Sequence, residues 1–265
     1  MTSWRISTQH FVLPKEGSAE DECEDAVAQS ADASRFALAD GATEAFDARR
    51  WATRLAETWV AAKSAPLTVE EFRPWLVEQG EWLRASWEGR KLSWYADEKR
   101  RAGSFAAFVG LKLEARGRGM RWDAVALGDS CLVQTRSGRV ETAMPLSTHE
   151  EFNSSPPLVP SNESAHDVAL ARLVSARGEA ERGDVFLLMS DALSAWYFES
   201  LSKRDGRAAE FDSLVAASEN ESLAELVRRE RESKRMKDDD VAVVRVSIGK
   251  DEGGRMKDEV KAIKA

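Results

Sequence analysis

The chain has 265 residues, of which 43% are hydrophobic and 32% are charged, enough to build the core of one large domain or two small ones. Its formal net charge of −8 argues against general nucleic-acid binding, because phosphate backbones select basic surfaces. No apolar stretch is long enough to span a bilayer, and the N-terminus lacks the basic and then apolar pattern of a secretion signal. With only two cysteines, far apart, a disulfide framework is not expected, and we predict a cytoplasmic protein.

The first half of the chain shows strand patterns followed by helix patterns. Residues 4–8 alternate in polarity and 35–39 form an apolar run, so both segments are predicted strands. A helix is predicted next, because apolar residues recur at helical spacing at Phe46, Trp51, Leu55 and Trp59. Thr68, with Glu71 three residues later, predicts the capped start of a second helix. Its apolar stripe comprises Phe72, Trp75, Leu76, Trp82 and Leu83.

The second half is rich in strand patterns. Residues 104–113, 121–127 and 131–135, separated by glycine-containing turns, predict a meander of antiparallel strands. The serine- and proline-rich segment 145–165 is expected to be a loop. Strands are then predicted at 184–190 and 240–247, with helices near 192–201 and 222–234 between them. Two groups of strands with helices between them indicate a single α+β layered sandwich domain over 1–248, followed by a charged tail over 249–265.

Four aspartates each stand at an end of an apolar run. They are Asp40 in FALADGA, Asp129 in ALGDS, Asp191 in LLMSDA and Asp239 in KDDDVAVV. Carboxylates gathered at strand ends repel one another unless cations lie between them, so the pattern predicts a metal centre. Taken singly, Asp40-Gly41 is also typical of a strand-ending turn, and 238–240 of a solvated loop. Only the joint pattern favours the metal site.

In chain order, six segments resemble the PPM family of metal-dependent protein phosphatases (protein phosphatase type 2C). They are ECEDAV (22–27), ALADGATEA (37–45), AGSFAAFVG (102–110), ALGDS (126–130), LLMSDAL (187–193) and KDDDVAVV (237–244). Each match is short, but their order and spacing run through nearly the whole chain. The resemblance implies a four-layer α-β-β-α sandwich of two antiparallel sheets flanked by helix pairs. It also implies two bound Mn²⁺ or Mg²⁺ ions.

The resemblance also implies a role for each matching residue. Asp40 would supply a bridging carboxylate and Gly41 a backbone carbonyl to the two ions, with Asp191 and Asp239 as further ligands. Asp129 would face a weaker third metal site. The catalytic pair Glu24 and Asp25 would orient metal-bound waters. These residue types suit Mg²⁺ and Mn²⁺, which prefer oxygen ligands and keep several waters.

The chain departs from the family pattern at several positions. Where members usually have Asp-Gly-x-Gly-Gly, residues 40–44 contain Thr43 and Glu44, which requires a different turn and adds a negative charge. Ala192 and Ala195 replace a glycine and an acidic residue often found there, which weakens the third site. Lys15 is the nearest basic residue upstream of the Glu-Asp pair, in the region where many members hold the substrate phosphate with an arginine.

Other conspicuous residues receive ordinary structural interpretations. His10, His149 and His166 have no partner at metal-ligand spacing and are expected in surface or loop positions. The tryptophans at helical spacing, Trp51, Trp59, Trp75 and Trp82, are expected in the core. The segment 225–235 is mixed in charge and predicts an exposed helix face, while Cys131 is expected to be buried.

Together these features predict a monomeric metal-dependent hydrolase of phosphate monoesters, with phosphoserine or phosphothreonine in proteins as substrate. An opposing serine/threonine kinase is the implied partner. Two alternatives stay open: a catalytically impaired relative that binds phosphoproteins, and a phosphatase of a small phosphorylated metabolite.

Overall fold

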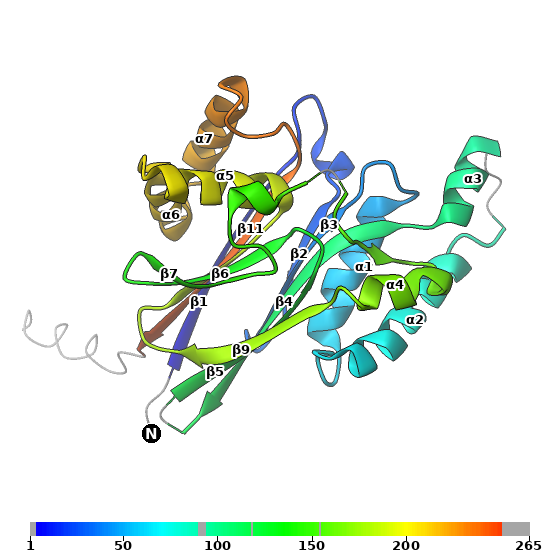
Figure 1. Ribbon diagram of the computed structural model, residues 1–265, viewed down its shortest axis with the longest axis horizontal. Helices are drawn as coiled ribbons and strands as arrows, with labels where there is room; N and C mark the ends of the chain where they lie inside the picture. The colour runs from blue at the N-terminus through cyan, green and yellow to red at the C-terminus, as the bar shows by residue number, and fades with distance from the viewer. Residues whose placement is uncertain (1–3, 90–93, 118, 154, 251–265) are drawn as a thin grey trace, which may run out of the picture.

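The computed structural model describes residues 4–89, 94–117, 119–153 and 155–250 (Figure 1). The strands are β1 (Trp4–Leu13), β2 (Asp25–Gln29), β3 (Arg35–Gly41), β4 (Phe105–Arg116), β5 (Gly119–Leu127), β6 (Cys131–Arg136), β7 (Arg139–Met144), β8 (Val159–Pro160), β9 (Val174–Ala180), β10 (Val185–Met189) and β11 (Val241–Lys250). The helices are α1 (Ala48–Ala61), α2 (Val69–Ala85), α3 (Trp94–Ala102), α4 (His166–Leu170), α5 (Asp191–Lys203), α6 (Arg207–Ala217) and α7 (Asn220–Glu232). None of the helices in these ranges combines the length and hydropathy that a membrane crossing requires.

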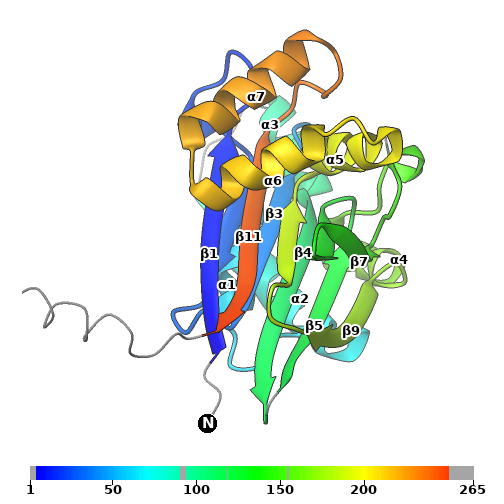
Figure 2. The same ribbon diagram turned by 90° about the vertical axis from the view of Figure 1, so that its left-hand side faces the viewer.

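The strands form two antiparallel sheets. The first has the order β1-β11-β10-β6-β7, and the second has the order β2-β3-β4-β5-β9, with β8 paired to β4. Helices α1 and α2 lie on one side of the molecule, and α5, α6 and α7 lie on the other (Figures 1 and 2). Helices therefore cover the outer face of each sheet, as a layered α+β sandwich requires.

Three apolar layers hold these elements together. Side chains such as Leu38 and Phe186 fill the space between the two sheets. A second layer, which includes Trp51 and Trp59, joins α1 and α2 to the second sheet. A third layer, which includes Trp196, joins α5, α6 and α7 to the first sheet. Helices, sheet, sheet and helices in this order confirm the predicted α-β-β-α sandwich, although three helices rather than a pair cover the first sheet.

The predicted start of α2 is confirmed in atomic detail. The Thr68 hydroxyl accepts a hydrogen bond from the Glu71 N–H at 3.3 Å, and the Glu71 carboxylate accepts one from the Thr68 N–H at 3.3 Å. Two backbone donors that the helix itself cannot satisfy are thereby paired. In the helix before it, Trp51 and Trp59 are fully buried, as predicted.

The predicted three-stranded meander is wrong at its third strand. Strands β4 and β5 pair as expected, but β6 pairs with β7 and β10 in the other sheet. The change of sheet occurs at Gly128, which has φ of +121° and lies so close to Ala107 that a Cβ would approach the Ala107 Cβ to 2.5 Å. Only glycine fits this corner.

Several elements were not predicted, and the last strand is longer than expected. The unpredicted elements are β2, β7, β8, β9, α3, α4 and α6. The proposed boundary at 248 falls inside β11, because Gly249 and Lys250 continue the pairing with Arg5 and Trp4 of β1. The rest of the predicted tail, 251–265, lies outside the described residues.

Three expectations about exposure are also wrong. Trp82 was expected in the core but is 37% exposed. The guanidinium groups of Arg50 and Arg54 lie over its ring. His166 is fully buried, because α4 packs against α2. Glu230, in the segment expected to form an exposed face, is 1% exposed because three arginines converge on it.

Candidate metal centre

The ends of four strands bring the predicted acidic residues to one edge of the sandwich. Strand β2 begins with Asp25 and β3 ends with Asp40-Gly41, and the two aspartates are direct partners in the antiparallel register. Strand β10 ends just before Asp191, and its neighbour β11 begins just after Asp239. The sequence prediction that these carboxylates share one edge thus agrees with where the strands place them.

The charges of the other aspartates at this edge act on Asp40. Burial raises the pKa of Asp40 well above its usual range, and the charges of four other aspartates raise it further. These are Asp25, Asp191, Asp129 and Asp239. Burial and the charge of Asp191 likewise raise the pKa of Asp129 to about 7. Carboxylates that raise one another's pKa in this way favour a bound cation, which would stabilise their charged forms.

Asp25 gives the clearest sign that a cation or its waters belong here. Its side chain is buried, and neither carboxylate oxygen accepts a hydrogen bond of ordinary geometry from a residue that the structure describes. Burial and then the charge of Asp240 raise the pKa of Asp25 well above its usual range. A buried carboxylate without partners is costly, so the site is complete only when a polar ligand reaches these oxygens.

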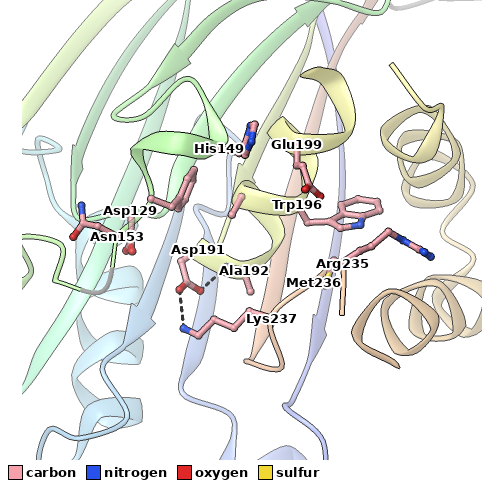
Figure 3. Close-up of a pocket in the computed structure, with 12 residues that line it drawn as sticks. Asp129, His149, Asn153, Asp191, Ala192, Trp196, Glu199, Arg235, Met236 and Lys237 are labelled. Atoms are coloured by element: carbon pink, nitrogen blue, oxygen red, sulfur yellow. Dashed lines mark hydrogen bonds and ion pairs between the residues drawn. The ribbon is translucent and has the colours of Figure 1, made fainter. Parts of the chain in front are cut away.

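Lys237, which directly precedes the acidic run 238–240, lies between two predicted ligands. Its Nζ is 2.6 Å from Asp239 Oδ2. It is also 3.3 Å from Asp191 Oδ2, a contact that Figure 3 shows. No local pattern singles this lysine out, because its contact with Asp191 spans 46 residues.

Asp240, predicted only as the neighbour of a ligand, holds the edge of the site together. Its Oδ1 accepts from the backbone N–H of Lys15 at 2.8 Å, and its Oδ2 accepts from that of Glu24 at 2.7 Å. It thereby ties the start of β11 to the segment that carries Glu24 and Asp25. Such charge-assisted bonds are among the stronger ones in proteins.

Lys15 and Glu24 lie side by side at the edge of the cluster. The Lys15 Nζ is 3.4 Å from Glu24 Oε2 and 3.3 Å from Thr43 Oγ1. Thr43 belongs to the altered turn after Asp40, which the N–H of Ala45 closes by donating to the carbonyl of Ala42 at 2.8 Å. The added charge of Glu44 forms an ion pair with Lys99 at 3.3 Å.

A pocket of about 470 Å³ opens beside the acidic cluster. Asp129, Asp191 and Lys237 form one part of its wall, and His149 and Phe152 come from the segment 145–165 (Figure 3). Trp196 and Ala195 of α5 complete an apolar part of the lining. An aryl or peptide group attached to a phosphate at the cluster would have room here.

The residues fit a pair of hydrated divalent ions better than a closed protein cage. Within the described ranges, no three His, Cys, Asp or Glu side chains are arranged to hold an ion by themselves. Mg²⁺ and similar ions keep several waters and use few direct carboxylates, so a cage is not required. The raised pKa values and the partnerless oxygens of Asp25 are features that such hydrated cations would satisfy.

Comparison with known proteins supports this fold at low sequence identity. No protein-family model and no curated protein matches the sequence. Among solved structures, the catalytic domain of the serine/threonine protein phosphatase PstP with two manganese ions has 16% identity and a TM-score of 0.58, covering 93% of this chain and 100% of that one. The Mycobacterium tuberculosis serine/threonine phosphatase PstP/Ppp has 19% identity and a TM-score of 0.61, covering 93% and 99%.

A further match is PppA, described as a key regulatory component of the type VI secretion system in Pseudomonas aeruginosa, with 20% identity, a TM-score of 0.55 and coverage of 93% and 99%. These similarities run over nearly the full length of both chains in each pair. The protein therefore has the fold of the PPM metal-dependent phosphatases, as its motifs predict.

Proposed function

We propose that this protein is a metal-dependent phosphatase that hydrolyses phosphate monoesters, with phosphoserine or phosphothreonine in proteins as its substrate. The observation that carries the proposal is the convergence of Asp25, Asp40, Asp129, Asp191 and Asp239 at one edge of the sandwich, on a fold shared with metal-dependent phosphatases. Mutually repelling carboxylates, of which Asp25 and Asp129 are buried, lie beside an open pocket and are suited to binding divalent cations and an anionic substrate.

In this proposal Asp40, Asp191, Asp239 and the carbonyl of Gly41 hold two Mn²⁺ or Mg²⁺ ions. Asp129 faces a weaker third site. The ions, when bound, lower the pKa of a shared water and neutralise the phosphoryl oxygens. Neither cysteine serves as a nucleophile, since burial raises the pKa of both the Cys23 and the Cys131 thiols to about 12.

The remaining roles fall to the other residues of the edge. Glu24 and the buried Asp25 orient waters at the ions, and the partnerless oxygens of Asp25 are free to accept from them. Lys15 forms an ion pair with Glu24 at 3.4 Å and is suited to hold a phosphate oxygen. Asp240 keeps the backbone of Lys15 and Glu24 in place.

The substrate assignment rests on the pocket and on the names of the similar structures. Two of these are serine/threonine phosphatases by description, and the pocket has room for a side chain next to the phosphate. We further propose that the protein is a cytoplasmic monomer without nucleic-acid or membrane partners. A serine/threonine kinase would phosphorylate the substrates that it dephosphorylates. A binding module without turnover is the second candidate, favoured by the cation of Lys237 between two predicted ligands.

Hydrolysis of an aryl phosphate by purified protein tests the proposal. We expect turnover with Mn²⁺ or Mg²⁺, none with chelator, and loss of turnover in Asp191→Ala. The control is Asp212→Ala, since Asp212 accepts from the Tyr197 hydroxyl and is not among the residues of the acidic edge. No turnover by folded protein with either ion would contradict the enzyme and favour the binding module. Equal rates on phosphopeptides and small esters would favour the metabolite phosphatase.

A further inference from the structure

Asp191 and Asp239 each have both carboxylate oxygens committed within the protein. Asp191 Oδ1 accepts from the N–H of Ala192 at 2.5 Å, and Asp239 Oδ1 accepts from that of Asp240 at 3.0 Å. The two remaining oxygens, both Oδ2, are the ones that Lys237 contacts. The backbone N–H groups thus occupy one oxygen of each carboxylate. Lys237 contacts the other oxygen of each, which is the one that an external cation could bind.

The loop that carries Lys237 is held firmly in position. Arg231 of α7, only 9% exposed, donates to the backbone carbonyls of Asp239 and Pro14. The Asp239 N–H also donates to the Lys237 carbonyl at 3.1 Å, which closes a tight turn. The lysine therefore sits at a fixed point of the backbone, two residues before the carboxylate that it contacts, and only its side chain needs to move to leave the site.

Lys237 and a divalent ion compete for the same place. A metal ligated by these oxygens lies about 2.0–2.2 Å from them, well inside the 2.6 Å that separates the ammonium from Asp239 Oδ2. Two cations that close repel each other strongly, so one must leave. The Lys237 side chain is 63% exposed, which gives the ammonium an open way to water.

We propose that Lys237 is a built-in counter-ion that occupies a cation position between Asp191 and Asp239, and that metal binding is an exchange in which its ammonium is displaced. This inference rests on the proposed function. The single charge of Lys237 relieves the repulsion between the two carboxylates in the metal-free protein. The same charge competes with a divalent ion and therefore raises the ion concentration needed to fill half of the sites.

Calorimetric titration of the metal-free protein with Mn²⁺ tests the exchange without measuring activity. Lys237→Met should bind Mn²⁺ roughly threefold to tenfold more tightly than the wild type, because no ammonium has to be displaced. Lys237→Arg, which keeps the charge, should bind like the wild type. The matched control is Lys203→Met, which removes a lysine from an exposed ion pair with Glu199 on α5 and should leave the affinity unchanged.

A second measurement checks the other half of the exchange. In chelator, Lys237→Met should melt at a lower temperature than the wild type, and Lys237→Gln provides the same test if the first variant does not fold. Equal Mn²⁺ affinity in wild type and Lys237→Met would overturn the exchange while leaving the metal centre intact. Absence of Mn²⁺ binding in both proteins would overturn the proposed function together with the exchange.

Discussion

Asp25 and Asp40 stand directly opposite each other on the antiparallel strands β2 and β3. Like charges at directly opposed positions of a sheet are destabilising, and here both side chains also have raised pKa values. If only contacts within the protein mattered, uncharged side chains at these two positions would make the fold more stable. The pair is therefore best explained by a ligand that needs both charges.

This arrangement predicts an unusual pH dependence of the metal-free protein. The pKa of Asp129 rises to about 7, so between pH about 4 and 7 the folded state binds more protons than the unfolded state. The free energy of unfolding should therefore fall as the pH rises through this range, by on the order of 2–4 kcal/mol from Asp129. Urea unfolding in chelator between pH 4.5 and 8 measures it.

Two variants isolate the contribution of Asp129. In Asp129→Asn, the free energy of unfolding should decline less steeply as the pH rises. Burial also raises the pKa of Asp212 to about 6, so Asp212→Asn should remove a second, separate part of the same decline. His166 acts in the opposite direction, because burial lowers its pKa and its protonation favours the unfolded state. A decline as steep in Asp129→Asn as in the wild type would refute this assignment.

Glu230 of α7 is predicted to be a major structural contributor. Hydrogen bonds from Arg235 chiefly hold its pKa at about 2, and it also accepts from Trp196 at 3.0 Å and Arg207 at 3.1 Å. Glu230→Ala removes the acceptor of Trp196 and Arg235 next to α5, the helix that begins at Asp191, while Arg207 keeps its ion pair with Asp205. We expect a loss of about 3 kcal/mol in the free energy of unfolding, measured in urea.

The control for Glu230 is a glutamate in an exposed ion pair. Glu210 pairs with Arg229 at 3.1 Å, and both side chains are about half exposed. Glu210→Ala should therefore cost less than about 1 kcal/mol. Similar losses in the two variants would show that burial of Glu230 adds nothing to its contribution.

Gly41 is predicted to tolerate no side chain. A Cβ at this position would lie 2.9 Å from the backbone carbonyl carbon and oxygen of Ala48, at the start of α1, and 3.0 Å from the Glu24 carbonyl. Gly41→Ala should lower the free energy of unfolding of the metal-free protein by about 1–3 kcal/mol, because backbone has to move. Gly119→Ala is the control, since its Cβ would meet only an ordinary contact at 3.7 Å. A wild-type melting temperature in Gly41→Ala would contradict this contact.

Local patterns in the sequence predicted a layered α+β sandwich with an acidic edge, and the family resemblance implied its four layers. The cap at Thr68 and the apolar runs before Asp40 and Asp191 are short-range features, and the structure places them as predicted. Helix α6 was missed because it starts after Gly206, with no side-chain cap. The contacts of Lys237 with Asp191 and of Glu230 with Arg207 join residues distant in the sequence, so no local pattern could show them.

Crystals grown with Mn²⁺ and measured at the manganese absorption edge would test the metal centre most directly. We expect two anomalous peaks at the sheet edge, next to Asp40, Asp191 and Asp239, with the Lys237 side chain turned away from both carboxylates. Absence of a peak at this edge, with Lys237 still between Asp191 and Asp239, would contradict the assignment of these residues as metal ligands.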